Sequence, residues 1–131
     1  MIEIYCDGAY SSNRNTGGWA FVVLKDGEKI FSDWFPVSNT TNNRMEIEAT
    51  MQACLWCNSM GIEEVTIYSD SMYVIGTMTK NWKRNKNNDL WVTLDKLASG
   101  LRIEWKHVKG HSGSKYNELC DALAVQATFI T

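Results

Sequence analysis

The chain has 131 residues, of which 44% are hydrophobic and 21% charged; this is the composition of an ordinary globular protein of about one domain. It contains no apolar run near the ~18 residues of a membrane span, and its first residues lack the basic start and apolar core of a signal peptide. The net charge of −2 excludes the overall basic excess with which most nucleic-acid binders neutralise phosphates. Any nucleic-acid binding must therefore use a local site or bridging cations.

Hydrophobic periodicity and turn signals predict nine elements in the order β-β-β-α-β-α-α-β-α. Asp26 and Gly27 form a hairpin turn signal, residues 40–43 offer helix N-caps, and Gly61 is a helix C-cap candidate. The expected strands are residues 2–7, 18–25, 28–36, 64–69 and 101–108, and the expected helices are 43–60, 71–79, 89–98 and 116–128.

This order predicts an α/β fold with a five-stranded mixed sheet. Three antiparallel strands come first, and strands joined through helices then add in parallel by right-handed crossovers. Helices should cover both faces of the sheet. We expect residues 1–131 to form a single domain.

The four cysteines are expected to be free thiols in a reducing cytoplasm. Cys54 and Cys57 form a CxxC pair, but the chain has no second pair and no histidine beside it. We therefore interpret them as small residues on one helix face and not as a zinc or redox site.

Two aspartates fall where strands are expected to end. Asp7 closes the first strand and is followed by Gly8, which allows another backbone to approach closely. Asp70 closes the fourth strand, and in open α/β sheets sites form at the carboxyl ends of strands. The alternatives are that Asp7 is a turn residue and that Asp70 caps the next helix.

Two further carboxylates lie on apolar helix faces. Glu46 shares a face with Ala49, and Asp121 shares one with Ala124. Glu48 falls nearly opposite Glu46 and is expected to be solvated. A buried carboxylate is costly unless it is paired or bound to a metal, and oxygen clusters suit Mg²⁺ or Mn²⁺. Two such ions can clamp the attacking water and the leaving oxygen of a phosphodiester.

Five segments containing these residues resemble motifs of the type 1 ribonuclease H family, in the family's order and over nearly the whole chain. They are YCDGA at 5–9, TNNRME at 41–46, YSDSMYV at 68–74, VKGHSG at 108–113 and NELCDALA at 117–124. The resemblance implies the ribonuclease H-like fold.

The resemblance also implies the roles of five residues. Asp7, Glu46, Asp70 and Asp121 match the family carboxylates that hold two Mg²⁺ (or Mn²⁺) ions. His111 matches the loop histidine that assists proton transfer or product release, and a loop histidine can titrate near neutral pH.

Substrate contacts follow from the same resemblance. Polar donors at helix starts suit phosphate, and amides suit the 2′-hydroxyl that distinguishes RNA from DNA. Trp82 is expected to lie against DNA sugars, whereas Trp91 is expected in the core. The expected nucleic-acid-binding residues are Gly8, Asn13, Thr41, Asn42, Asn43 and Trp82.

The chain departs from the family pattern in two places. Residues 80–88 are short and contain four basic residues, where many members carry a long basic protrusion. Met72 replaces a polar residue found in some relatives, and it cannot donate a hydrogen bond in the minor groove. These departures bear on substrate affinity and discrimination.

The implied activity is endonucleolytic hydrolysis of the RNA strand of an RNA–DNA hybrid, leaving 5′-phosphate and 3′-hydroxyl ends. We expect a monomer without an obligate protein partner or membrane association. The alternatives are a non-catalytic hybrid-binding domain, another nuclease of the same superfamily, or a relative of a reverse-transcriptase ribonuclease H domain.

Overall fold

The computed structural model describes residues 1–109 and 114–130, and their elements follow the predicted order. The strands are β1 (Ile2–Ser11), β2 (Thr16–Lys25), β3 (Glu28–Ser38), β4 (Glu64–Ser69) and β5 (Arg102–His107). The helices are α1 (Asn42–Ser59), α2 (Met72–Lys80), α3 (Asn88–Ala98) and α4 (Lys115–Ala127). Within these ranges, no helix is long and apolar enough to cross a membrane.

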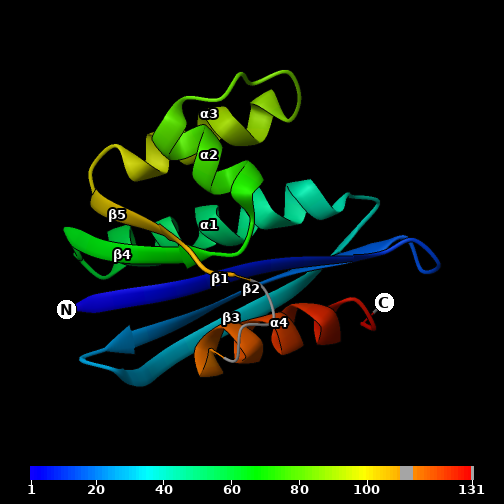
Figure 1. Ribbon diagram of the computed structural model, residues 1–131. Coiled ribbons are helices and arrows are strands. Elements are labelled where there is room, and N and C mark those ends of the chain that lie inside the picture. The colour runs from blue at the N-terminus through cyan, green and yellow to red at the C-terminus, as the bar shows by residue number, and fades with distance from the viewer. Residues whose placement is uncertain (110–113, 131) are drawn as a thin grey trace.

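The sheet has the strand order β3-β2-β1-β4-β5, so β1 lies at its centre. The pairs β1–β2 and β2–β3 are antiparallel, and the pairs β1–β4 and β4–β5 are parallel. Helices α1, α2 and α3 lie on one side of the sheet and α4 on the other (Figure 1). The predicted mixed sheet with helices on both faces is confirmed.

Two hydrophobic cores hold these layers together. The larger core lies between the sheet and α1 to α3, and Trp91 is buried in it as predicted, with 1% of its surface exposed. The smaller core packs Cys120 and Ala124 of α4 against Ala20 and Val22 of β2. Aligned apolar strand faces thus bury one helix layer on each side of the sheet.

The first strand is longer than predicted. The sequence places Asp7 at the end of a strand, but β1 continues to Ser11 because its antiparallel ladder with β2 extends to the pair Ser11–Thr16. Asp7 therefore lies inside the central strand, opposite Ala20. The alternative that Asp7 is a turn residue is wrong.

The predicted N-cap region of α1 is confirmed, whereas the C-cap is Met60, one residue before the predicted Gly61. At its start, the Oγ1 of Thr41 accepts a hydrogen bond from the backbone N–H of Arg44 at 3.1 Å. At its end, Gly61 adopts a left-handed φ of 71°, and the N–H of Ile62 donates to the carbonyl of Cys57 at 2.9 Å. These local signals determine the residues at which α1 begins and ends.

All four cysteines are free and buried. Cys54 and Cys57 belong to the larger core, on the face of α1 that packs against the sheet. This placement agrees with their interpretation as small packing residues.

Gly18 of β2 lets α4 pack directly on the sheet. A Cβ atom there would lie 2.5 Å from the carbonyl oxygen of Ala124 and 2.5 Å from the Cβ of Ala127. We expect Gly18→Ala to lower the free energy of unfolding by about 1–3 kcal/mol, because the backbone of α4 has to shift. Urea denaturation measures this change. The control is Gly100→Ala, where a Cβ meets nothing within 4 Å, and equal stabilities of the two variants would contradict the packing argument.

Candidate metal centre

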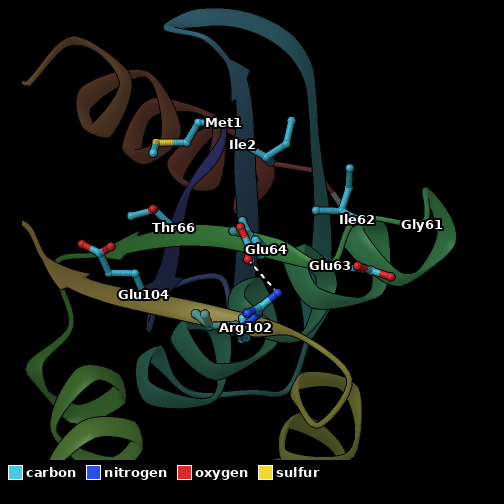
Figure 2. Close-up of a pocket in the computed structure, with 11 residues that line it drawn as sticks. Met1, Ile2, Gly61, Ile62, Glu63, Glu64, Thr66, Arg102 and Glu104 are labelled. Carbon is cyan, nitrogen blue, oxygen red and sulfur yellow. Dashed lines mark ion pairs between the residues drawn. The ribbon is translucent and has the colours of Figure 1, made fainter.

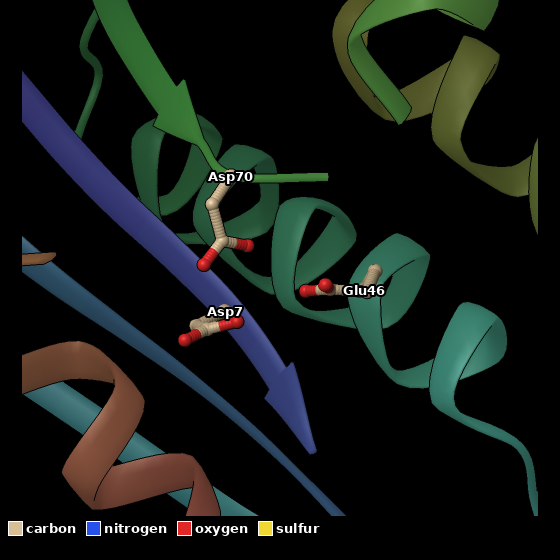
Figure 3. A group of neighbouring side chains, drawn as sticks. All are labelled: Asp7, Glu46 and Asp70. Carbon is tan, nitrogen blue, oxygen red and sulfur yellow. The ribbon is translucent and has the colours of Figure 1, made fainter. Parts of the chain in front are cut away.

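Three carboxylates from three different elements converge beside the central strand. Asp7 comes from β1, Glu46 from α1, and Asp70 from the residue after β4. Figure 3 shows the three side chains gathered around β1, with Asp70 and Glu46 pointing toward Asp7. One oxygen from each lies within 4.8 Å of the others. This spacing suits a shared cation, since carboxylate oxygens are the ligands of hard divalent ions.

Gly8 allows α1 to come this close to β1. A Cβ on Gly8 would lie 2.4 Å from the carbonyl carbon of Met45 and 2.5 Å from the nitrogen of Glu46. Its backbone N–H donates to Oδ1 of Asp7 at 2.9 Å and to Oε1 of Glu46 at 2.7 Å. One backbone donor therefore orients two of the three carboxylates.

A short turn after β4 positions Asp70. The Oγ of Ser69 accepts a hydrogen bond from the N–H of Ser71 at 3.1 Å. Ser71 is the N-cap of α2, and its Oγ accepts from the N–H of Val74 at 3.2 Å. The alternative that Asp70 caps this helix is therefore wrong, and its side chain points toward the other carboxylates (Figure 3).

Two of the three clustered carboxylates, Asp7 and Glu46, resist ionisation. Asp7 is 2% and Glu46 7% exposed. Burial raises the pKa of both groups, and the charge of Asp70 raises both further. The hydrogen bond from Gly8 partly offsets this effect at Glu46. Among the described residues, Oδ2 of Asp7 is a buried oxygen without a hydrogen-bond partner, as expected of an atom that a cation would coordinate.

Asp121 approaches the same site from the opposite side of the sheet. It lies on α4, is partly buried, and its charge contributes to the raised pKa values of Asp7 and Glu46. Asp121 does not belong to the close group, however. In the described part of the chain, the oxygens within 4.8 Å of one another come from Asp7, Glu46 and Asp70. Asp121 is thus a charged neighbour of the cluster.

The other predicted site residues are spread over separate elements. His111 lies outside the described residues. Asn13 is exposed in the turn between β1 and β2, and Trp82 follows α2 with 43% of its surface exposed. Thr41, Asn42 and Asn43 are exposed at the start of α1, where the Thr41 side chain serves as the N-cap.

The burial of two polar side chains was not predicted. Glu48, expected to be solvated, is half-buried; burial raises its pKa, and its Oε2 is among the buried atoms without a partner in the described ranges. The cause is the packing of α3 against α1, with Asp89 close enough to raise the pKa further. Asn117, four residues before Asp121 on α4, is 3% exposed. Its Oδ1 is likewise a buried atom without a hydrogen-bond partner in the described ranges. The spacing of four places it on the face of Asp121.

An open hollow of about 800 Å³ lies at the other end of the sheet (Figure 2). It is lined by the beginnings of β1, β4 and β5 and includes the ion pair between Arg102 and Glu64, at 2.8 Å. Glu64 begins β4 whereas Asp70 follows its end, so the two sites are roughly 20 Å apart along the strand. The hollow therefore contributes nothing to the carboxylate cluster.

The acidic cluster on a mixed α/β sheet defines a candidate site for divalent cations, and comparison with known proteins gives the family. The model of the RNase H family matches residues 1–129. The chain is 38% identical to the ribonuclease H of Treponema denticola, with 96% of each chain covered. The chain therefore belongs to the ribonuclease H family and is a ribonuclease, a hydrolase.

Solved structures agree with this assignment. RNase H1 of the halophilic archaeon Halobacterium salinarum is 27% identical to the chain, with a TM-score of 0.84 over 96% of each chain. LC11-RNase H1, solved in complex with an RNA/DNA hybrid, is 20% identical, with a TM-score of 0.81 over 97% of this chain and 99% of that one. At 20% identity, the similarity to LC11-RNase H1 shows the fold alone.

The raised pKa values predict a pH-dependent stability of the metal-free protein. A carboxyl group whose pKa is higher in the folded than in the unfolded state stabilises the fold at low pH. That contribution is lost as the pH rises from about 4 through neutrality. We expect Asp7→Asn, which keeps the acceptor for Gly8, to raise the free energy of unfolding in EDTA at pH 8 by roughly 1–3 kcal/mol and to change it little at pH 4.

Urea denaturation at several pH values measures this difference. Asp33→Asn is the matched control, because Asp33 is exposed and likewise accepts a hydrogen bond from the next backbone N–H. If the Asp7→Asn protein were less stable than the wild type at pH 8, the proposed repulsion between Asp7 and its neighbouring carboxylates would be contradicted.

Proposed function

We propose that the protein is an endonuclease that hydrolyses the RNA strand of RNA–DNA hybrids and leaves 5′-phosphate and 3′-hydroxyl ends. The observation that carries the proposal is the convergence of Asp7, Glu46 and Asp70 in a chain of the ribonuclease H family. The hybrid bound by LC11-RNase H1, a protein of the same fold, supports the choice of substrate.

We assign the metal ligands to Asp7, Glu46, Asp70 and Asp121. Two Mg²⁺ or Mn²⁺ ions held there would activate the attacking water and neutralise the leaving 3′-oxygen. The chain itself keeps the ligands in place, since the Gly8 N–H holds one oxygen each of Asp7 and Glu46. Oδ2 of Asp7 has no hydrogen-bond partner in the described ranges, and the raised pKa values of Asp7 and Glu46 support a cation as the stabilising partner of this cluster.

Binding of nucleic acid through bound cations is compatible with the negative net charge of the protein. The net charge is −2, and three arginines are engaged in ion pairs within the described part of the protein, one of them the Arg102–Glu64 pair described above. Arg44 pairs with Asp89 at 2.8 Å, and Arg84 of the short basic segment pairs with Asp95. A metal-loaded carboxylate cluster would attract the phosphate backbone despite the acidic balance of the chain.

The remaining roles are assigned from the motif positions. His111 would assist proton transfer or product release. Hybrid contacts would come from Gly8 and Asn13, from the exposed start of α1, and from Trp82. The three consecutive residues at that helix start are Thr41, Asn42 and Asn43, which suit phosphate and sugar hydroxyls.

We further propose that residues 1–131 act as one domain and as a monomer in the cytoplasm. The four free cysteines are compatible with a reducing compartment.

The test is cleavage of a labelled RNA–DNA hybrid, with single-stranded RNA, duplex RNA and duplex DNA alongside, in Mg²⁺, Mn²⁺ or EDTA. We expect metal-dependent cutting of RNA in the hybrid only. Asp7→Asn, Glu46→Gln, Asp70→Asn and Asp121→Asn should each lower kcat/KM by at least about 100-fold, because each removes a ligand charge.

Glu48→Gln is the matched control, since Glu48 lies on the same helix as Glu46 without joining the cluster, and it should retain cleavage. His111→Ala should give a milder defect, mainly in turnover. A carboxylate variant with near wild-type rate would remove that residue from the site. A folded wild-type protein that binds but never cuts the hybrid would leave a hybrid-binding domain as the function.

A further inference from the structure

Arg14 fastens the turn between β1 and β2 to the far end of the chain. Its Nε donates to the backbone carbonyl of Thr128 at 3.0 Å, and its Nη2 donates to Oγ1 of Thr128 at 3.0 Å. The guanidinium carbon lies 3.7 Å from the centre of the Phe129 ring, within the range of a cation–π contact. Three contacts thus join residues that are more than 110 positions apart.

The partner of Arg14 is a helix end without a cation of its own. Thr128 is the C-cap of α4, and the last turn of that helix contains no basic residue. Carbonyls at a helix C-terminus carry partial negative charge, which a cation stabilises. Arg14 supplies this cation from another part of the sheet. Gly18 brings the two parts together, because its missing side chain lets α4 lie against the start of β2.

Two short-range hydrogen bonds order the turn around Arg14. The Oγ1 of Thr16 donates to the carbonyl of Arg14 at 3.0 Å, and the N–H of Asn15 donates to the carbonyl of Ser12 at 3.3 Å. Asn13 stands at the exposed tip of this turn, directly before Arg14. The position of Asn13 therefore depends on where Arg14 holds the tip.

The alternative role for Arg14 is a direct ionic contact to phosphate beside Asn13. The geometry opposes it, because two of its donors and one face of its guanidinium are occupied within the protein. We propose that Arg14 is a positioning residue that latches the β1–β2 turn to the end of α4 and so holds Asn13 against the hybrid. This inference rests on the proposed function of Asn13.

The test compares Arg14→Ala, Arg14→Lys and Phe129→Ala for KM, kcat, hybrid affinity by fluorescence anisotropy, and the dependence of affinity on salt. Lysine keeps the charge but loses the two-pronged bond and the stacking. Phe129 is 62% exposed, so its truncation spares the core. All three variants should raise KM about fivefold with kcat unchanged and with the wild-type salt slope.

Two controls complete the design. Arg102→Ala removes one exposed positive charge at the opposite end of the sheet and should change neither KM nor the salt slope. Asn13→Ala should raise KM in the wild-type background and have a smaller effect when combined with Arg14→Ala, because the two residues act as one unit.

Two outcomes would overturn the latch while the wild type still cleaves the hybrid. In the first, Arg14→Lys behaves as wild type, Phe129→Ala is neutral, and Arg14→Ala reduces the salt slope by about one, as loss of a phosphate contact does. In the second, no variant changes KM or affinity. A wild-type protein that neither binds nor cleaves the hybrid would instead refute the proposed function, and the latch with it.

Discussion

The contact between β1 and α1 at Gly8 is the constraint on which the site depends. Because Gly8 has no side chain, the helix backbone approaches the central strand closely enough for one N–H to bond Asp7 and Glu46 together. The same contact forces two buried carboxylates into proximity, at a cost in electrostatic free energy that the surrounding cores have to offset. A divalent cation would turn this repulsion into attraction. The site is therefore a strained part of a well-packed domain, as functional sites commonly are.

Much of the fold could be predicted because its signals are local. The start of α1 is set by Thr41 and its end by the left-handed Gly61 directly after the C-cap Met60, and both signals were readable from the sequence to within one residue. The mixed sheet followed from the order of the elements and the handedness of crossovers. The length of β1 could not be predicted in this way. Its end at Ser11 is set by pairing with Thr16 across a turn, which continues the ladder past Asp7.

The candidate site was predictable to the extent that helical periodicity reveals burial. Glu46 shares its helix face with Ala49, and both are buried as expected. The same reasoning wrongly predicted that Glu48 is solvated, because α3 covers a second side of α1. The periodicity of one helix contains no information on such a tertiary contact. The burial of Asn117 was not predicted, because the search for costly buried groups considered charged side chains and Asn117 is an uncharged amide. Its spacing of four from Asp121 was the available signal.

Whether this cluster of carboxylates holds divalent cations can be measured by anomalous scattering from crystals soaked in Mn²⁺. We expect anomalous density within about 2.0–2.3 Å of oxygens of Asp7, Glu46 and Asp70, and its loss or weakening in crystals of the Asp7→Asn protein. Density confined to other parts of the molecule, or none at all from a protein that still cleaves the hybrid, would contradict the assignment of the site.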